Sequence, residues 1–345
     1  MRGGWLGRIG RGFVHVLLVF AIALSALWIG FCLYFQLPFG DAGRTIAIAG
    51  WALFAIAVIV LTFSRRKWPA SACYVVAVLV FGAWWSTILP SNDRDWAPDV
   101  AHSVSGTVDG DIVTLHNVRN FGWRTDEDFT PRWETRTYDL SQIKSVDLIL
   151  AYWAGPTIAH TIVTFGFENG DHVSFSAEIR REKTQAFSAI AGFFRVFTLV
   201  LVAADERDVV HLRTNVRKED VYLYPLGMPK AGMRALFLSY VDAGNALNAA
   251  PKFYNTLTTN CTTVVFRLIR ALDPGLPVDY RILISGHLPS YVFDHQGYQT
   301  GLSYEEFRRR AAISALGLAA GDSPDFSSAI RPPTGLFVPR DLKYP

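Results

Sequence analysis

One cysteine stands at the start of a predicted helix, in the segment YNTLTTNCTTVVFRLIRAL. Apolar residues recur at helical spacing after Cys261, and Thr258, Thr259 and Asn260 before it are residue types that cap helix N-termini. A thiol in this position faces unpaired backbone N–H groups and the positive end of the helix dipole, which lower its pKa. The segment therefore predicts a nucleophilic cysteine. The same N–H groups, together with Asn260 and Thr262, form a candidate oxyanion hole.

A histidine and a carboxylate that could serve this thiol lie on a predicted hairpin, HTIVTFGFENGDHVSFSAEIRR. Apolar and polar residues alternate on both sides of Asn169-Gly170, which is a strong turn signal. A three-residue loop with Gly170 in the left-handed conformation would pair His160 with Glu178 and sort the polar side chains to one face. A four-residue loop would shift the register by one residue and mix the faces, so we favour the first. Cys261, His160 and Glu178 are then the candidate nucleophile, base and third member of a catalytic group.

The other cysteines do not explain this thiol. Cys32 and Cys73 lie within apolar runs near the N-terminus, so neither can meet Cys261 without leaving the membrane. An oxidising compartment normally pairs its cysteines, and one left over is either buried and inert or kept for reactivity. Both interpretations of Cys261 stay open on this count alone.

The apolar runs predict three membrane-spanning helices, over about residues 13–37, 45–63 and 70–89. Each run is long enough to cross a hydrocarbon core of about 30 Å. A cleaved signal peptide is the alternative for the first run. That run, however, exceeds the roughly 7–15 apolar residues of such a peptide, and two further runs follow it. We expect residues 1–92 to form a membrane anchor.

Positive charges flank these runs unevenly. Three arginines precede the first run and RRK lies between the second and third, whereas the connection between the first and second carries only Arg44. The positive-inside rule then places the N-terminus in the cytoplasm and the chain after the third run outside the inner membrane. In a bacterium with an outer membrane, this predicts a periplasmic domain.

The remainder of the chain reads as a linker, residues 93–105, and one α+β periplasmic catalytic domain, residues 106–345. The segment TVDGDIVTLHNV predicts a first hairpin around Asp109-Gly110. TLVLVAADERDVVHLRTN and DVYLYPL are typical of strands, and the residues after about 273 are expected to be mostly loops. Helices are expected, besides the one at the cysteine, over residues 184–197, 229–248 and 303–316.

Several function classes find no support. The net charge is only +3, and no basic run after the spans indicates nucleic-acid binding. His287 and His295 lack an accompanying HxxxH or CxxC pattern, so we expect no metal and no other cofactor. The sequence contains neither a GxSxG elbow nor a P-loop, which leaves a serine hydrolase and an NTPase unsupported.

Several motifs occur in order along the chain: RNFGWRTDEDFTPRWETRTYDL, YWAGPTIAHTIV, EIRREK, FRVFTLVLVAADERDVVHLRTN, VYLYPL and YNTLTTNCTT. Together they resemble the Lnb N-terminal periplasmic domain family. They cover roughly residues 110–300. The resemblance implies a permuted papain-like fold, akin to NlpC peptidases and lecithin:retinol acyltransferase, in which the histidine strand precedes the cysteine helix. It also implies a lipoprotein N-acyltransferase with Cys261 as nucleophile, His160 as base and Glu178 as acidic partner.

Three functions stay open. The first is an acyltransferase that moves a fatty acyl group from a phospholipid, through a Cys261 thioester, to the N-terminal amine of a lipoprotein or peptide in the membrane. The second is a cysteine peptidase or amidase acting on peptidoglycan or on membrane-proximal peptides. The third is a non-catalytic envelope scaffold with an inert thiol. We favour the first because both of its substrates reside in the membrane that the helices span.

Overall fold

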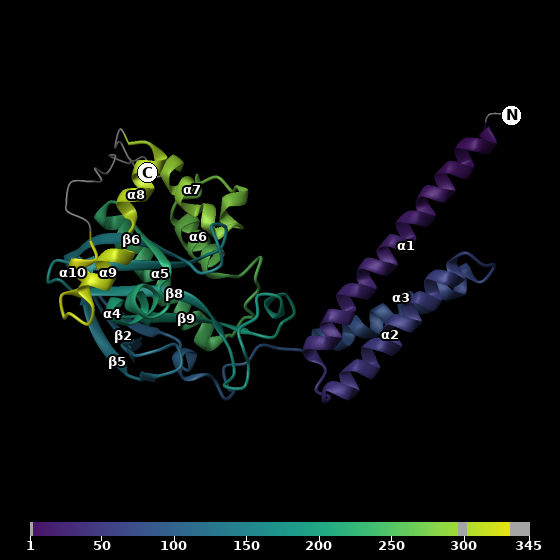
Figure 1. The fold of residues 1–345 in the computed structure, drawn as a ribbon, viewed down its shortest axis with the longest axis horizontal. Coiled ribbons are helices and arrows are strands. Elements are labelled where there is room, and N and C mark those ends of the chain that lie inside the picture. Colours follow the sequence, from purple (N-terminus) through teal and green to yellow (C-terminus); the bar gives the residue numbers. More distant parts are fainter. Residues whose placement is uncertain (1–2, 296–301, 332–345) are drawn as a thin grey trace. The chain divides into compact units, whose positions relative to one another are not determined.

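The chain begins with three long helices: α1 (Gly3–Gln36), α2 (Asp41–Thr62) and α3 (Lys67–Ser86) (Figure 1). The computed structural model describes residues 3–295 and 302–331. Stretches of these helices with mean hydropathies of 2.7, 2.4 and 1.5 are long and apolar enough to cross a membrane. The three predicted spans are therefore confirmed as helices of spanning length and composition.

The α-carbon contacts divide the chain into two units. The first, called the membrane unit here, comprises Met1–Pro90 and Ser188–Val196, and the second, the sheet unit, comprises Ser91–Phe187 and Phe197–Pro345. The chain therefore passes between the units three times.

Polar and aromatic groups join the helices inside the membrane unit. The Tyr74 hydroxyl hydrogen-bonds the Ser25 hydroxyl at 2.8 Å and donates to the Ile22 carbonyl at 3.1 Å. The indole of Trp51 donates to the Ala26 carbonyl at 2.9 Å. Interhelical hydrogen bonds of this kind specify packing where lipid supplies no hydrophobic force between helices.

The segment Ser188–Val196 packs on these helices. The ring of Phe194 stacks on Phe31 and Phe35 at centroid distances of 5.5 and 5.2 Å. The guanidinium of Arg195 donates to the Trp85 carbonyl at 2.6 Å and lies over the indole ring of the same residue.

The helix predicted over residues 184–197 is wrong. Only Ala191–Phe193 form one 3₁₀ turn, and Arg195 has a φ of 58°, which no right-handed helix contains. Phe194 packs in the membrane unit, whereas Phe197 belongs to the sheet unit and is buried. The apolar residues of this segment therefore pack in two different units and do not form one helical face.

The sheet unit is built on an eight-stranded sheet of order β1-β2-β9-β8-β7-β6-β10, with β5 paired to β2. Its strands are β1 (Ser105–Asp109), β2 (Ile112–Arg119), β5 (Trp133–Asp139), β6 (Ile143–Tyr152), β7 (Ala159–Phe167), β8 (His172–Arg180), β9 (Thr198–Ala204) and β10 (Asp220–Pro225). The pairs from β9 through β8, β7 and β6 to β10 are antiparallel, and β2 runs parallel to β9. A separate two-stranded ladder joins β3 (Gly122–Trp123) and β4 (Phe129–Thr130).

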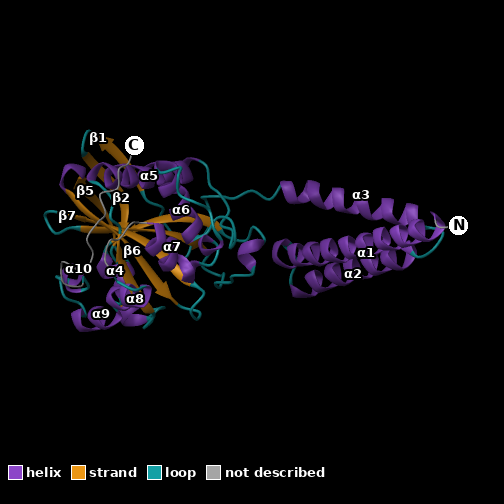
Figure 2. Cartoon of the chain, turned by 90° about the horizontal axis from the view of Figure 1, so that it is seen from above, coloured by secondary structure: helices purple, strands orange, loops and turns teal. Residues whose placement is uncertain are grey.

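Helices cover both faces of this sheet (Figure 2). One face buries Val163, Phe165 and Phe175 against α5 and α6, and the other buries Ile162, Val200 and Val202 against α4, α9 and α10. The helices are α4 (Glu206–His211), α5 (Lys230–Ala249), α6 (Cys261–Leu272), α7 (Leu288–His295), α8 (Tyr304–Ala311), α9 (Ser314–Ala320) and α10 (Phe326–Ala329). The mixed helix and strand content confirms the α+β class.

The β7–β8 hairpin has the predicted register. Ile162 pairs with Ser176 and Phe165 with Val173, around a three-residue loop in which Gly170 has a φ of 89°. Glycine is favoured in this left-handed conformation because it has no Cβ that would clash with the backbone. The hairpin around Asp109-Gly110 is confirmed, with Gly110 and Asp111 as its turn, and so is the helix expected over 229–248.

Three expectations about other elements are wrong. The second half of TLVLVAADERDVVHLRTN is helical, because the Asp205 side chain caps α4 by accepting from the Arg207 N–H at 2.9 Å. The helix expected over 303–316 is two helices, interrupted where Ala312 bridges to Tyr222 of β10. His287 and His295, expected in loops, end a 3₁₀ turn and α7.

Candidate active site

The site lies at one end of the sheet. Tyr152 at the end of β6 pairs with Ala159 at the start of β7, and Arg180 at the end of β8 pairs with Thr198 at the start of β9. His160 is the second residue of β7, so the hairpin register brings Glu178 of β8 to the same place.

Cys261 is the first residue of α6, and a capping box fixes this end of the helix. The Asn260 side chain accepts from the Thr263 N–H at 2.9 Å, and the Thr263 hydroxyl accepts from the Asn260 N–H at 2.8 Å. The N–H groups of Cys261 and Thr262 belong to the first turn, which an α-helix leaves without acceptors of its own. They are the candidate oxyanion donors.

A hydrogen bond between two buried threonines joins α6 to β7. The hydroxyls of Thr161 and Thr262 lie 2.8 Å apart. Since each threonine follows directly after a candidate catalytic residue, this contact fixes the spacing between Cys261 and His160.

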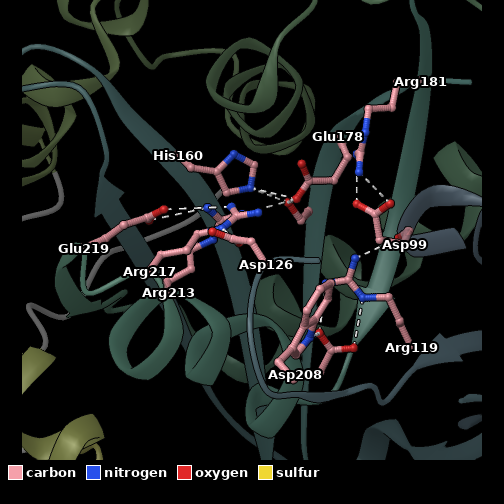
Figure 3. Close-up of polar contacts among 12 residues, drawn as sticks. Asp99, Arg119, Asp126, His160, Glu178, Arg181, Asp208, Arg213, Arg217 and Glu219 are labelled. Atoms are coloured by element: carbon pink, nitrogen blue, oxygen red, sulfur yellow. Dashed lines mark hydrogen bonds and ion pairs between the residues drawn. The ribbon is translucent and has the colours of Figure 1, made fainter. Parts of the chain in front are cut away.

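His160 is buried and bonded to two side chains of β8. Its Nε2 lies 2.6 Å from the Ser176 hydroxyl and 3.0 Å from Oε1 of Glu178, and that hydroxyl donates to Glu178 at 2.7 Å. Figure 3 shows the imidazole and the Glu178 carboxylate pointing toward each other. Because Nε2 faces the carboxylate, Nδ1 is the nitrogen left for the thiol.

Cys261 and His160 shift each other's proton affinity. Burial alone would raise the pKa of the Cys261 thiol. The charge of His160, a hydrogen bond with its ring and one from the Thr161 backbone outweigh burial and lower that pKa. Burial likewise opposes the charged form of His160, yet the negative charges of Glu178 and Cys261 raise its pKa to about 9. Both shifts favour a thiolate–imidazolium pair over the neutral thiol and imidazole.

Glu178 is held ionised. Burial would raise the pKa of its carboxyl, but His160, Arg213 and the Ser176 hydroxyl lower it well below the ordinary value. An ionised carboxylate beside Nε2 orients the ring and stabilises the imidazolium.

Arg213 was missed from the sequence. It lies in a π-helical turn, Leu212–Val216, and its guanidinium is 3.6 Å from Glu178 and 3.5 Å from Glu219 (Figure 3). The side chain is buried, and among the described residues its Nε has no hydrogen-bond partner. Only the tertiary fold brings it to the site, so no local pattern could have found it. Ser176 could have been found, because it lies two residues before Glu178 on the same strand face.

The structure thus brings Cys261, His160 and Glu178 together, with Thr262 alongside; their catalytic roles stay predictions. Asn260 is a structural cap, and its side-chain amide already donates to the Thr256 carbonyl at 2.7 Å. We therefore assign the candidate oxyanion hole to backbone N–H groups.

A cavity of about 300 Å³ lies elsewhere, lined among others by Arg132, Arg207 and His211. Each of these three has a carboxylate partner, namely Glu134, Asp205 and Asp322 respectively. The cavity therefore offers no uncompensated positive charge. Within residues 3–295 and 302–331, no group of three or more His, Cys, Asp or Glu side chains is placed to hold a metal ion.

Fold and site together define a membrane protein whose α+β domain holds a Cys–His–Glu cluster. Residues 129–286, which lie mostly in the sheet unit, match the family model of the Lnb N-terminal periplasmic domain. With the three apolar helices, this makes the chain an inner-membrane protein with a periplasmic domain. Neither the curated proteins nor the solved structures contained a match.

Proposed function

We propose that this protein is a thiol acyltransferase that moves a fatty acyl group from a phospholipid to the N-terminal amine of a lipoprotein. The observation that carries the proposal is the pairing of Cys261 with His160, which Glu178 supports, in a domain that matches the Lnb family model and follows three apolar helices. The order of the base on β7 before the nucleophile on α6 is the order of permuted papain-like folds, which we propose for this domain.

In the first half-reaction, the Cys261 thiolate attacks the carbonyl carbon of the phospholipid ester. Backbone N–H groups of Cys261 and Thr262 stabilise the oxyanion that forms. When this intermediate collapses, the ester C–O bond breaks and the departing alkoxide takes a proton from the His160 imidazolium. The products are a lysophospholipid and an acyl thioester on Cys261.

In the second half-reaction, the free amine of the lipoprotein attacks the thioester carbonyl. Neutral His160 takes the proton that the amine nitrogen loses, and the C–S bond breaks to regenerate the thiolate. Glu178 holds the ring in one orientation through both steps. We propose that the N-terminus lies in the cytoplasm, as the positive-inside rule predicts, so that the site works on the periplasmic side.

The test is transfer of a labelled acyl chain. The full chain would be reconstituted in vesicles whose phospholipid carries an isotope-labelled acyl group, with a synthetic diacylglyceryl-cysteine peptide as acceptor. Mass spectrometry should find the labelled amide with the wild type and with Cys73→Ser, a control thiol in α3 outside the site, and none with Cys261→Ser.

Other products would contradict the proposal in distinct ways. Labelled free fatty acid without amide would indicate a lipid hydrolase. Cleavage of the peptide without acyl transfer would indicate a peptidase or amidase. Equal transfer by Cys261→Ser would remove the thiol from the mechanism.

A further inference from the structure

Large apolar side chains surround the end of the sheet that holds the site, on segments outside the catalytic group. Together they are called the apolar rim here, and each is 38–54% exposed: Trp153, Ile158, Phe187, Leu257, Leu283 and Ile284. Contiguous exposed apolar surface on a folded domain marks a place of contact with another apolar body.

Contacts within the sheet unit connect the rim to the site. Ile158 lies two residues before His160, on the connection that also carries Trp153, whose ring meets Phe187 at 5.3 Å. The next rim segment adjoins this connection, because Ser285, directly after Ile284, accepts from the Ala159 N–H at 2.9 Å.

Leu257 approaches from the cysteine side. It belongs to a turn closed by Asn255, whose side-chain oxygen accepts from the N–H groups of Leu257 and Thr258, each at 3.0 Å. The capped helix with Cys261 begins just after this turn. The rim therefore has members on the histidine side and on the cysteine side of the pair.

The opposite end of the same strands is polar. The β7–β8 loop consists of Glu168, Asn169 and Gly170, all exposed. In an isolated domain both ends of the sheet would be in water and could be equally polar. The contrast between the apolar rim and this polar loop indicates that the two ends face different surroundings.

The chain leaves the sheet unit for the membrane unit at the site end. The crossings lie at residues 90/91, 187/188 and 196/197. Thr198, two residues after the last crossing, starts β9 and donates from its hydroxyl to the Ser91 carbonyl at 3.3 Å. Asn92 follows the first crossing and accepts from Arg180, the last residue of β8, at 2.9 Å.

We propose that the apolar rim inserts into the surface of the lipid bilayer. The occupant is lipid because the segments that leave the domain at this end continue into helices of membrane-spanning composition. Insertion would bring Cys261 to the level of phospholipid ester groups. This role of the rim in bringing Cys261 to its substrate rests on the proposed acyl transfer. Insertion itself can be measured on an inactive protein.

The test is the depth of spin labels in the full chain, reconstituted in phosphatidylethanolamine–phosphatidylglycerol vesicles. A Cys32→Ser, Cys73→Ser, Cys261→Ser background would carry one nitroxide, introduced through Ile158→Cys or through Leu257→Cys. Glu168→Cys, at the far end of the same strands, is the matched control. Both rim labels should collide with oxygen several-fold more often than with a water-soluble nickel complex, and the control should show the reverse.

Rim labels as accessible to nickel as the control would overturn the proposal. Rim labels protected from both reagents would also overturn it, because they would show contact with protein, such as a second copy. A further variant, Ile158→Ser/Leu257→Ser, should raise KM for phospholipid in vesicles about tenfold while leaving a soluble short-chain acyl donor unaffected. If the rim labels insert but the wild-type protein transfers no acyl group, membrane insertion of the rim is supported and the proposed acyl transfer is refuted.

Discussion

His160 uses its two ring nitrogens for different partners. Nε2 is held by Ser176 and Glu178, and the other nitrogen is left for Cys261. The ring must carry a proton toward a leaving group and remove one from an amine, so its pKa decides when each step can run. The side chains around the ring set that pKa in opposite directions.

Glu178→Gln is expected to lower the pKa of His160 from about 9 toward its ordinary 6.5, because the substitution removes the negative charge that opposes desolvation of the ring. Acyl transfer at neutral pH should fall about 10- to 100-fold. The measurement is a histidine carbon-13 NMR titration, with the His160 signal assigned from His160→Gln. Glu168→Gln, on the loop of the same hairpin, is the control. An unchanged His160 pKa in Glu178→Gln would show that the carboxylate does not set the proton affinity of the ring.

The same pair contributes stability in a defined pH window. The raised pKa of His160 stabilises the fold fully below 6.5, and this contribution is lost as pH rises through about 9. The lowered pKa of Glu178 stabilises the fold above 4.5 and is lost as pH falls below it. The Tm difference between wild type and Glu178→Gln should therefore be largest between pH 4.5 and pH 6.5, where both contributions are present, and should shrink toward pH 10. A difference independent of pH would contradict the linkage.

Arg213→Met should move the pKa of His160 the other way. The positive charge of Arg213 lowers that pKa, so its removal is expected to raise it. Stability should fall by up to about 3–5 kcal/mol, since Glu219 and Glu178 lose a buried partner. Arg217→Met is the control, because Arg217 pairs with Asp126 and Glu219. Should both arginine variants give the same titration curve, Arg213 does not position the site.

At the scale of elements, close packing fixes the strand that carries the base. A Cβ on Gly286 would lie 2.3 Å from the Pro156 carbonyl oxygen and 2.7 Å from the Thr157 Cα, both backbone atoms just ahead of β7. Gly286→Ala is therefore expected to displace the start of β7, destabilise the domain by about 1–3 kcal/mol and reduce kcat more than KM.

Gly122→Ala is the matched control, because nothing lies within 4 Å of its Cβ. Thermal unfolding and steady-state kinetics measure both effects. Unchanged kinetics in a less stable Gly286→Ala protein would show that the position of β7 is not critical for the site.

Elements whose pattern is local were predictable. Alternation and Asn169-Gly170 fixed the β7–β8 register, and the cap residues before Cys261 marked the start of α6. Elements that depend on remote partners were not. The segment 184–197 looked like one amphipathic helix because a sequence pattern cannot show that Phe194 and Phe197 pack in different units.

The candidate site divides in the same way. Period-2 spacing placed Glu178 opposite His160, and that relation holds in the structure. Arg213 reaches Glu178 from a π-helical turn whose residues read as a strand. Long-range ion pairs carry no signal in a single sequence.

At the scale of the whole molecule, the charges around the helices predict its orientation. The arginines before the apolar stretch of α1 and the RRK sequence where α3 begins indicate cytoplasmic ends. Alkaline phosphatase fused after residue 40 or after residue 95 should be active, and fused after residue 66 it should be inactive. The reverse pattern would place the sheet unit in the cytoplasm and exclude lipoprotein substrates of the periplasm.

The covalent state of Cys261 tests the proposed acyl transfer most directly. The full chain would be incubated with phospholipid in mixed micelles without acceptor, quenched in acid and analysed by intact mass spectrometry and peptide mapping. We expect one fatty-acyl mass on Cys261, which neutral hydroxylamine removes and which is absent in Cys261→Ser. A thiol that alkylates readily with iodoacetamide at neutral pH but never carries an acyl group would contradict it.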